Sequence, residues 1–213
     1  MNLTKTLAQK KAAAVQNIPA DKLAIMNNST NKLKTALLSK KAVSTGSILP
    51  DFNLPDVKNN KVSLDSFSND YYVISFYRGG WCPYCNLELQ ALQAVLDELK
   101  SLNTALIAIS PETPDHSLTT AQKNDLSFTV LSDLDNVYAK QLGLTFEMPE
   151  DLRTLYHAFN INVDKHNGNT NYELPMPSTY VINKKREIIY SFIPEDYTER
   201  LDPETILDVL KKQ

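Results

Sequence analysis

Two hydrophobic periodicities alternate along this chain. Short apolar runs rich in β-branched and aromatic residues predict buried strands, and segments with apolar residues three and four positions apart predict amphipathic helices. The strands are expected at residues 71–77, 104–109, 128–131, 178–182 and 187–192. Helices separate the first strands and a hairpin precedes the last helix, so the pattern predicts an α/β fold with a central mixed sheet flanked by helices.

The helix at the middle of the chain begins directly after residues 79–80 and carries leucines 89, 92, 96 and 99 on one stripe. Further helices are expected at residues 114–123, 135–143 and 203–211. Asp135 is the expected cap of the 135–143 helix and Gly143 its end. Residues 145–175 match no simple unit, although 149–159 can be helical; long irregular segments in compact domains are often functional.

Residues 1–42 are predicted to be an N-terminal helical extension, followed by one domain over residues 43–213. Two weakly amphipathic helices are expected at 3–17 and 21–41, with Asp21 as the cap of the second. The net charge is −3, but residues 1–50 hold eight Lys and one Asp (+7), which leaves −10 for the rest. No aromatic residue lies among these dispersed lysines, so the pattern favours a solvated face that packs on the body and predicts no nucleic-acid partner.

The composition is typical of a globular protein with a real core. The 213 residues are 42% apolar and 22% charged. The N-terminus shows no apolar stretch of signal-peptide type, and no run approaches the roughly 20 apolar residues needed to cross a bilayer. We therefore expect a cytoplasmic protein without a membrane partner; a homodimer remains open.

The chain's only two cysteines, Cys82 and Cys85, stand where the 71–77 strand gives way to a helix. The first turn of a helix has unpaired N–H groups and the positive end of the macrodipole, which favour a thiolate. Arg78 adds a positive charge, and such settings lower a cysteine pKa below about 8.5. Pro83 suits the first helical turn. The Cys-x-x-Cys spacing therefore predicts a pair that cycles between dithiol and disulfide.

Inert alternatives fit this placement less well. A structural zinc needs four ligands, and the three histidines at 116, 157 and 166 show no paired spacing. A static disulfide is unusual in a chain without secretory features. We therefore expect the two cysteines to be a redox-active pair. We expect neither a metal nor a cofactor.

Three stretches resemble the peroxiredoxins of the alkyl hydroperoxide reductase/thiol-specific antioxidant (AhpC/TSA) family. Residues 46–67 contain the Gly-x-x-x-Pro-x-Phe-x-Leu pattern, and residues 107–110 and 130–133 resemble later family segments. The resemblance covers about residues 44–193 and is closest to a Cys-x-x-Cys subgroup. It implies a thioredoxin-like fold, which a Cys-x-x-Cys near a βαβ pattern also indicates.

The resemblance places Cys85 at the peroxidatic position, with Pro83 two residues before it and Glu88 three residues after it. Cys82 replaces the family's Thr or Ser. Pro177, preceded by Met, stands where the family has an arginine and resembles the cis-proline of thioredoxins, so a cis bond facing the cysteines is expected. Arg78 is the candidate substitute for the missing arginine.

Two enzymatic hypotheses follow. In a peroxiredoxin-type peroxidase, Cys85 attacks a hydroperoxide, Cys82 resolves the sulfenic acid, and a dithiol such as thioredoxin restores the pair. In a thiol–disulfide oxidoreductase, Cys82 attacks a substrate disulfide and Cys85 resolves it, with residues Trp81, Tyr84 and Pro177 as the docking surface. The first ranks slightly higher because its resemblance spans more of the chain. A third, weaker hypothesis is a non-catalytic scaffold whose basic helical extension binds a partner.

Overall fold

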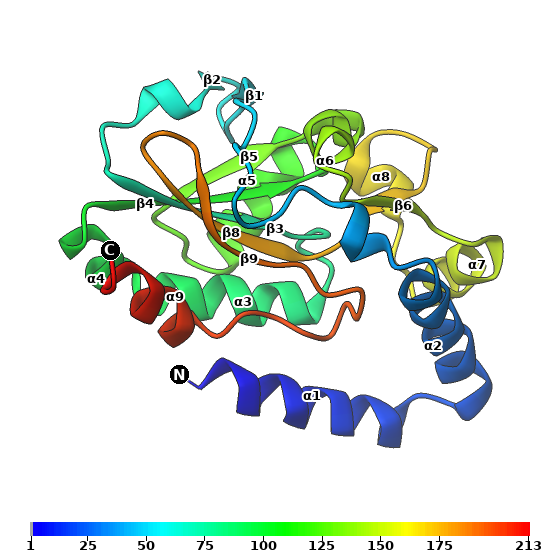
Figure 1. Ribbon diagram of the computed structural model, residues 1–213. Coiled ribbons are helices and arrows are strands. Elements are labelled where there is room, and N and C mark those ends of the chain that lie inside the picture. The colour runs from blue at the N-terminus through cyan, green and yellow to red at the C-terminus, as the bar shows by residue number, and fades with distance from the viewer. Residues whose placement is uncertain (1) are drawn as a thin grey trace.

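A five-stranded mixed sheet lies at the centre of the computed structural model, which describes residues 2–213 (Figure 1). Its order is β5-β4-β3-β8-β9; β3, β4 and β5 are parallel, and β8 is antiparallel to both β3 and β9. The strands are β3 (Tyr71–Phe76), β4 (Thr104–Ser110), β5 (Thr129–Ser132), β8 (Ser178–Asn183) and β9 (Ile188–Phe192). All five predicted strands are confirmed, with each bound within one residue of the prediction.

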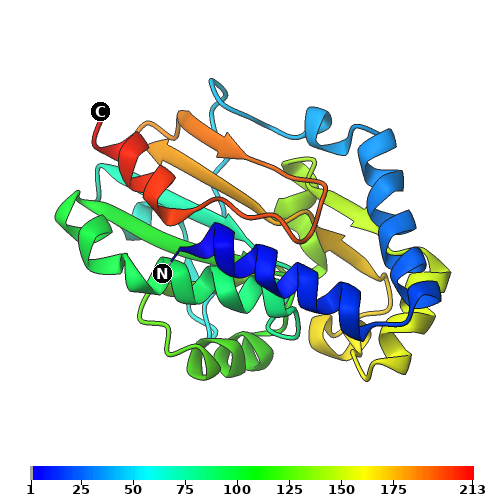
Figure 2. The ribbon, with the colours of Figure 1, turned by 90° about the horizontal axis from the view of Figure 1, so that it is seen from below.

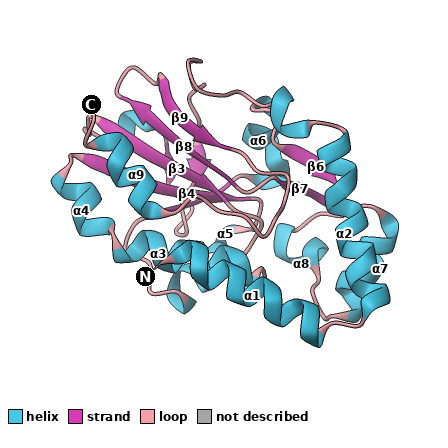
Figure 3. Ribbon diagram, turned by 60° about the horizontal axis from the view of Figure 1, so that its bottom comes forward, coloured by secondary structure: helices cyan, strands magenta, loops and turns pink. Residues whose placement is uncertain are grey.

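Helices cover both faces of this sheet because neighbouring residues of a buried strand point to opposite sides. Val73 of β3 packs with the leucines of three helices, whereas Ile74 packs with the other face. Figure 3 shows the helices of the first face on one side of the sheet and α6 on the other. The helices of the first face are α3 (Pro83–Ala94), α4 (Leu96–Ser101) and α9 (Pro203–Leu210).

The remaining elements lie around this layered centre. A small hairpin, β1 (Leu54–Pro55) with β2 (Lys61–Val62), lies with α6 (Val137–Gln141) toward the second face. Helix α5 (Pro114–Lys123) connects β4 to β5. No helix among residues 2–213 combines the length and the apolar character needed to cross a bilayer.

The N-terminal extension is helical, as predicted. Helix α1 (Leu3–Asn17) lies along α3, and α2 (Ala20–Thr35) packs on α7 (Figures 1 and 2). Leu3 and Leu7 of α1 are buried among residues of α3. Met1, the first residue of the predicted extension, lies outside the described residues.

Two helix boundaries differ from the expectation. Pro19, not Asp21, occupies the N-cap of α2, which ends at Thr35 before a short 3₁₀ turn. The carboxylate of Asp133, not of Asp135, accepts hydrogen bonds from the first backbone N–H groups of α6 at 2.9 and 2.8 Å. The backbone is left-handed at Asp135 and Asn136, directly before α6, which the apolar periodicity does not encode.

Residues 145–175 form a folded unit instead of a loop. Strand β6 (Thr145–Glu147) pairs with β7 (Glu173–Pro175), and α7 (Glu150–Ala158) and α8 (Val163–Asn167) lie between them. Their apolar residues make a separate small core, composed of Met148, Leu152, Leu155, Tyr156, Val163 and Leu174. Helix α7 agrees with the helical potential of residues 149–159, whereas β6, β7 and α8 are too short for a periodic signal, so the sequence pattern did not show the unit as a whole.

Candidate active site

A glycine turn carries the chain from β3 into α3 and places the two cysteines. Gly79 has φ +145°, and a Cβ there would lie 2.3 Å from the indole nitrogen of Trp81. A Cβ on Gly80 would lie 1.9 Å from the Thr120 hydroxyl. Trp81 and Thr120 can come this close to the backbone only because residues 79 and 80 have no side chain. The two glycines therefore fix the path of the backbone into the cysteine pair.

Both cysteines are free thiols buried at the start of α3. Cys82 is the N-cap residue and Cys85 lies in the first turn, with exposed fractions of 1% and 0%. Burial opposes ionisation, but a hydrogen bond from Cys85 and the charges of Arg78 and Arg200 lower the pKa of Cys82 to about 5. Burial and the neighbouring Cys82 raise the pKa of Cys85. Above about pH 5 the pair therefore holds one proton and one negative charge.

Arg200 is the functional residue that sequence reasoning missed. Its Nη2 donates to the Cys85 Sγ at 3.0 Å, and its Nε donates to Glu88 Oε2 at 2.5 Å. Its Nη1 donates to two backbone carbonyls of its own loop, at 2.7 and 2.6 Å. These four hydrogen bonds hold the buried guanidinium against the Cys85 sulfur. It lies at the Cys85 sulfur, where the sequence analysis had offered Arg78.

Glu88 orients that arginine from the next turn of α3. Its carboxylate is 1% exposed and pairs with Arg200. Burial raises the pKa of Glu88 to about 7 against the opposing effect of the Arg200 charge. Glu88, the acid that the resemblance placed three residues after Cys85, is thus in the site. It holds the guanidinium of Arg200, and the guanidinium in turn donates to the Cys85 sulfur.

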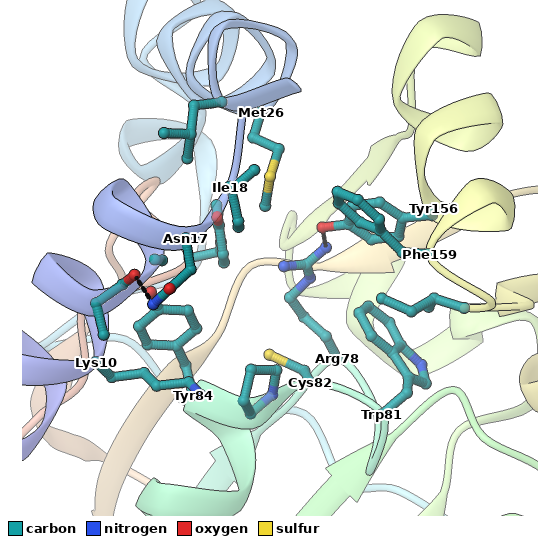
Figure 4. A pocket seen from close by; sticks show the side chains of 16 residues that line it. Lys10, Asn17, Ile18, Met26, Arg78, Trp81, Cys82, Tyr84, Tyr156 and Phe159 are labelled. Atoms are coloured by element: carbon teal, nitrogen blue, oxygen red, sulfur yellow. Dashed lines mark hydrogen bonds between the residues drawn. The ribbon is translucent and has the colours of Figure 1, made fainter. Parts of the chain in front are cut away.

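Arg78 belongs to the Cys82 side of the pair. Its guanidinium carbon lies 4.9 Å from the Trp81 ring centroid and 4.8 Å from that of Tyr197. Its Nη2 donates to the Tyr156 hydroxyl at 2.7 Å (Figure 4). Stacked among these rings, Arg78 is 2% exposed and favours the thiolate of Cys82. Arg200 therefore hydrogen-bonds to the Cys85 sulfur and Arg78 does not, whereas the charges of both arginines favour the thiolate of Cys82.

A cavity of about 310 Å³ opens on Cys82 (Figure 4). Trp81, Pro83 and Tyr84 line it together with Arg78, so most of the predicted supporting residues meet there. Pro177 does not: it lines a separate, smaller cavity beside Arg78. Every peptide bond among residues 2–213 is trans, so the predicted cis bond before Pro177 is wrong. The resemblance to the thioredoxin proline rested on the residues next to Pro177 alone. Strand β8 begins directly after Pro177 with a trans peptide bond.

A second buried carboxylate, Glu112, holds the glycine turn from behind. Its Oε2 accepts from the Gly80 N–H and from the Thr120 hydroxyl, both at 3.0 Å. Its Oε1 lies 3.0 Å from Nδ1 of His166, whose ring is 4.3 Å from that of His116. These histidines are far apart in the sequence, and no group of three or more His, Cys, Asp or Glu side chains within residues 2–213 is arranged to hold a metal ion.

Replacing Glu112 by alanine is expected to destabilise the protein by about 1–3 kcal/mol, because the buried Gly80 N–H loses its acceptor. The displaced turn should also slow oxidation of the thiols. Glu112→Gln is the matched control, since an amide oxygen still accepts one hydrogen bond. Urea unfolding and stopped-flow oxidation measure the two effects. Alanine and glutamine variants of equal stability and rate would contradict this role.

The fold and the buried dithiol define a redox protein of the thioredoxin-like class. The AhpC/TSA family model matches residues 45–191, and the chain belongs to this family. The predicted family and fold are therefore confirmed.

Several relatives carry peroxiredoxin names. Peroxiredoxin Bcp of Escherichia coli is 32% identical over 102 residues, which cover 48% of this chain and 65% of that protein. This match thus spans less than two thirds of the relative. Chloroplastic peroxiredoxin Q of Populus jackii is 28% identical over 175 residues, which cover 80% of this chain and 71% of that protein.

Solved structures share the fold. Peroxidoxin BcpB from Mycobacterium tuberculosis superposes with a TM-score of 0.65 at 19% identity and covers 80% of this chain and 97% of its own. Peroxiredoxin Q of Xanthomonas campestris gives a TM-score of 0.58 at 15% identity, over 76% of this chain and 90% of its own. The family match begins at residue 45, after both N-terminal helices.

Proposed function

We propose that this protein is a peroxiredoxin-type thiol peroxidase that reduces hydroperoxides through Cys85, with Cys82 as the resolving thiol. The observation that carries the proposal is the guanidinium of Arg200, which donates to the Cys85 sulfur at 3.0 Å and is held by Glu88. An N–H donor at a nucleophilic sulfur stabilises the thiolate and the charge that develops on the peroxide oxygens. The peroxiredoxin names of the relatives support the same activity.

In the first step, the one proton held by Cys82 and Cys85 is transferred to the leaving group. The pKa of each cysteine depends on the protonation of the other, so the proton can pass from Cys85 to Cys82 and leave the thiolate on Cys85. This thiolate attacks the terminal peroxide oxygen; the S–O bond forms and the O–O bond breaks. The alkoxide or hydroxide that leaves takes the proton of Cys82. The products are a sulfenic acid on Cys85 and an alcohol or water.

Resolution uses the same pair. The Cys82 thiolate, stabilised by Arg78, attacks the sulfenic sulfur of Cys85. The S–S bond forms and the S–O bond breaks; hydroxide leaves to the solvent, where an acid of the buffer protonates it. A dithiol reductant of the thioredoxin type then reduces the disulfide by exchange at Cys82, the sulfur that faces the cavity. Trp81 and Tyr84 beside it are the proposed docking surface.

Stopped-flow oxidation of the reduced protein tests the proposal. One equivalent of hydroperoxide should consume both thiols and leave a monomer with an internal disulfide. Free thiols are counted with a chromogenic reagent, and non-reducing electrophoresis reports crosslinked dimers. Two remaining thiols, or a disulfide-linked dimer, would contradict the proposed pairing.

A second candidate function is thiol–disulfide exchange, favoured by the position of Cys82 in the cavity and by its lowered pKa. Reduction of insulin disulfides by the same protein discriminates between the two. Rapid insulin reduction with slow peroxide oxidation would favour exchange. The reverse result favours the peroxidase.

A further inference from the structure

The cavity that opens on Cys82 has a wall that lies outside the residues matched by the family. Helices α1 and α2 supply this wall with four apolar side chains, Ala14, Ile18, Leu23 and Met26. Figure 4 shows the sulfur of Cys82 on the far side of the cavity from Ile18 and Met26. A molecule that reacts with this sulfur therefore has to fit between the N-terminal helices and the body of the protein.

We propose that this cavity binds a second reductant of the protein, a small aliphatic dithiol that carries a carboxylate at the end away from its thiols. The proposal rests on the disulfide between Cys82 and Cys85 that the proposed function forms. It adds to that function a binding site for a reductant that is not a protein, and it assigns the reductant's attack to Cys82.

The size of the cavity fits such a molecule. Cys82 is 1% exposed, so an attacking sulfur has to enter the cavity to reach it. The volume of about 310 Å³ lies at the lower end of the roughly 300–1,000 Å³ typical of small-molecule sites. This space holds one chain of several carbon atoms, and the second thiol of a dithiol completes the reaction without the entry of another molecule.

Oxidation leaves the buried charge of Arg78 without compensation. Its guanidinium lines the cavity and is 2% exposed; within residues 2–213 it donates to the neutral hydroxyl of Tyr156, and its Nε has no hydrogen-bond partner. In the dithiol form the negative charge of the cysteine pair compensates it, and the Arg78 charge in turn lowers the pKa of Cys82. In the disulfide neither sulfur is charged, and an unpaired buried cation is costly. A thiolate that enters the cavity restores the missing negative charge beside the sulfur that it attacks.

The rest of the lining selects the other parts of the molecule. Most of its side chains are apolar or aromatic, so a hydrocarbon chain is accommodated without stranding a buried polar group. Among residues 2–213, no carboxylate lines the cavity, and its second charged residue is Lys10 of α1. Lys10 is exposed and therefore lies at the mouth; the ion pairs of α1 and α2 with the body use Lys11 and Lys34 instead. A carboxylate on the outer end of the chain is the complementary group for Lys10.

Reduction proceeds by two exchange steps at Cys82. One thiol of the reductant loses its proton to the solvent and attacks the Cys82 sulfur; the new S–S bond forms, the bond to Cys85 breaks, and Cys85 leaves as a thiolate. Cys85 is buried outside the cavity, and Nη2 of Arg200, 3.0 Å from its sulfur, stabilises the departing charge. The second thiol, also deprotonated by the solvent, attacks the reductant's own bound sulfur, so that its ring disulfide forms and Cys82 is released as a thiolate. The cysteine pair then takes up one proton.

Reduction of the full-length disulfide form by dihydrolipoate tests the proposal, with dihydrolipoamide as the matched dithiol that lacks the carboxylate. The protein is oxidised with diamide, so that the assay requires no peroxide, and stopped-flow fluorescence of Trp81 follows the reduction. The rate with dihydrolipoate should level off as its concentration rises, because the reductant binds before it reacts. At low concentration dihydrolipoate should be about two- to fivefold faster than dihydrolipoamide, the scale of one partly exposed charge pair.

A pair of charge variants locates the carboxylate. Lys10→Gln should abolish the difference between the two dithiols, because the complementary charge is gone. Lys5→Gln removes the same charge from an exposed position of α1 outside the cavity, and it should preserve the difference. Equal rates for the two dithiols in the wild type, or the same loss in both lysine variants, would overturn the assignment.

A pair of size variants tests the entry route. Ile18→Trp fills the cavity and should slow both dithiols by about tenfold or more, the scale of apolar pocket discrimination. Gln16→Trp places the same indole on an exposed position of α1 outside the cavity and should change neither rate. An Ile18→Trp variant that is reduced as fast as the wild type, or a wild-type rate that stays linear in dihydrolipoate, would overturn the proposal. Failure of hydroperoxides to oxidise the reduced protein would instead refute the peroxidase function, and the result of the diamide-based assay would be unaffected.

Discussion

Replacing Cys85 by serine is expected to slow reaction with hydroperoxides by at least about a thousandfold, because removal of the nucleophile eliminates the covalent route. Cys82→Ser should still consume one equivalent of peroxide. It should stop at the sulfenic acid, since no second thiol is available to condense with it. Stopped-flow fluorescence of the neighbouring Trp81 follows the rate, and mass spectrometry after trapping with a 1,3-diketone locates the sulfenic acid.

The two variants control each other, because each removes one sulfur atom from the same buried pair. Rapid peroxide consumption by Cys85→Ser and none by Cys82→Ser would show that Cys82 is the attacking sulfur. In that case the Cys85→Ser variant should also trap mixed disulfides through Cys82, as a thiol–disulfide oxidoreductase does. The position of Arg200 on Cys85 predicts the opposite pattern.

The sequence was informative where local signals coincide. A β-rich run, two glycines, a proline at the first helical position and a leucine stripe together located β3, the turn and α3. Since the cysteines belong to that unit, their placement at the helix start followed directly. Glu88 followed from the family resemblance, which places an acid three residues after the peroxidatic cysteine.

The rest of the site depends on contacts that no local pattern encodes. Arg200 lies in an irregular, acid-rich stretch between β9 and α9. In such a stretch the sequence does not distinguish a buried arginine from an ordinary surface charge. Glu112 follows β4 and meets the glycine turn only through the parallel pairing of β3 with β4. The N-terminal extension was expected to pack by its apolar stripes, but an amphipathic pattern does not say which surface a stripe covers.

Arg200→Met is expected to slow peroxide oxidation of the thiols by about 10²–10³-fold, the usual cost of removing one preorganised donor. It should also destabilise the fold by about 3–5 kcal/mol, because Glu88 would remain buried without its partner. The rate should acquire a different pH dependence. Arg200 lowers the pKa of Cys82, so its removal raises the pH at which the pair first loses a proton.

The sign of that change is fixed by the chemistry, because only the thiolate attacks. In the wild type the oxidation rate should fall as the pH drops through about 5, where the pair becomes fully protonated. In Arg200→Met the same fall should begin at a higher pH. A pH series of stopped-flow rates measures the shift, with urea unfolding for stability.

A double variant separates the chemistry from the packing. In Glu88→Leu/Arg200→Met both charges are replaced by apolar side chains, so much of the lost stability should return, as it often does when a whole buried ion pair is replaced. The peroxide rate should stay low, because no guanidinium N–H reaches the Cys85 sulfur. Recovery of the rate together with the stability would show that Arg200 acts only by holding the fold and not on the thiolate.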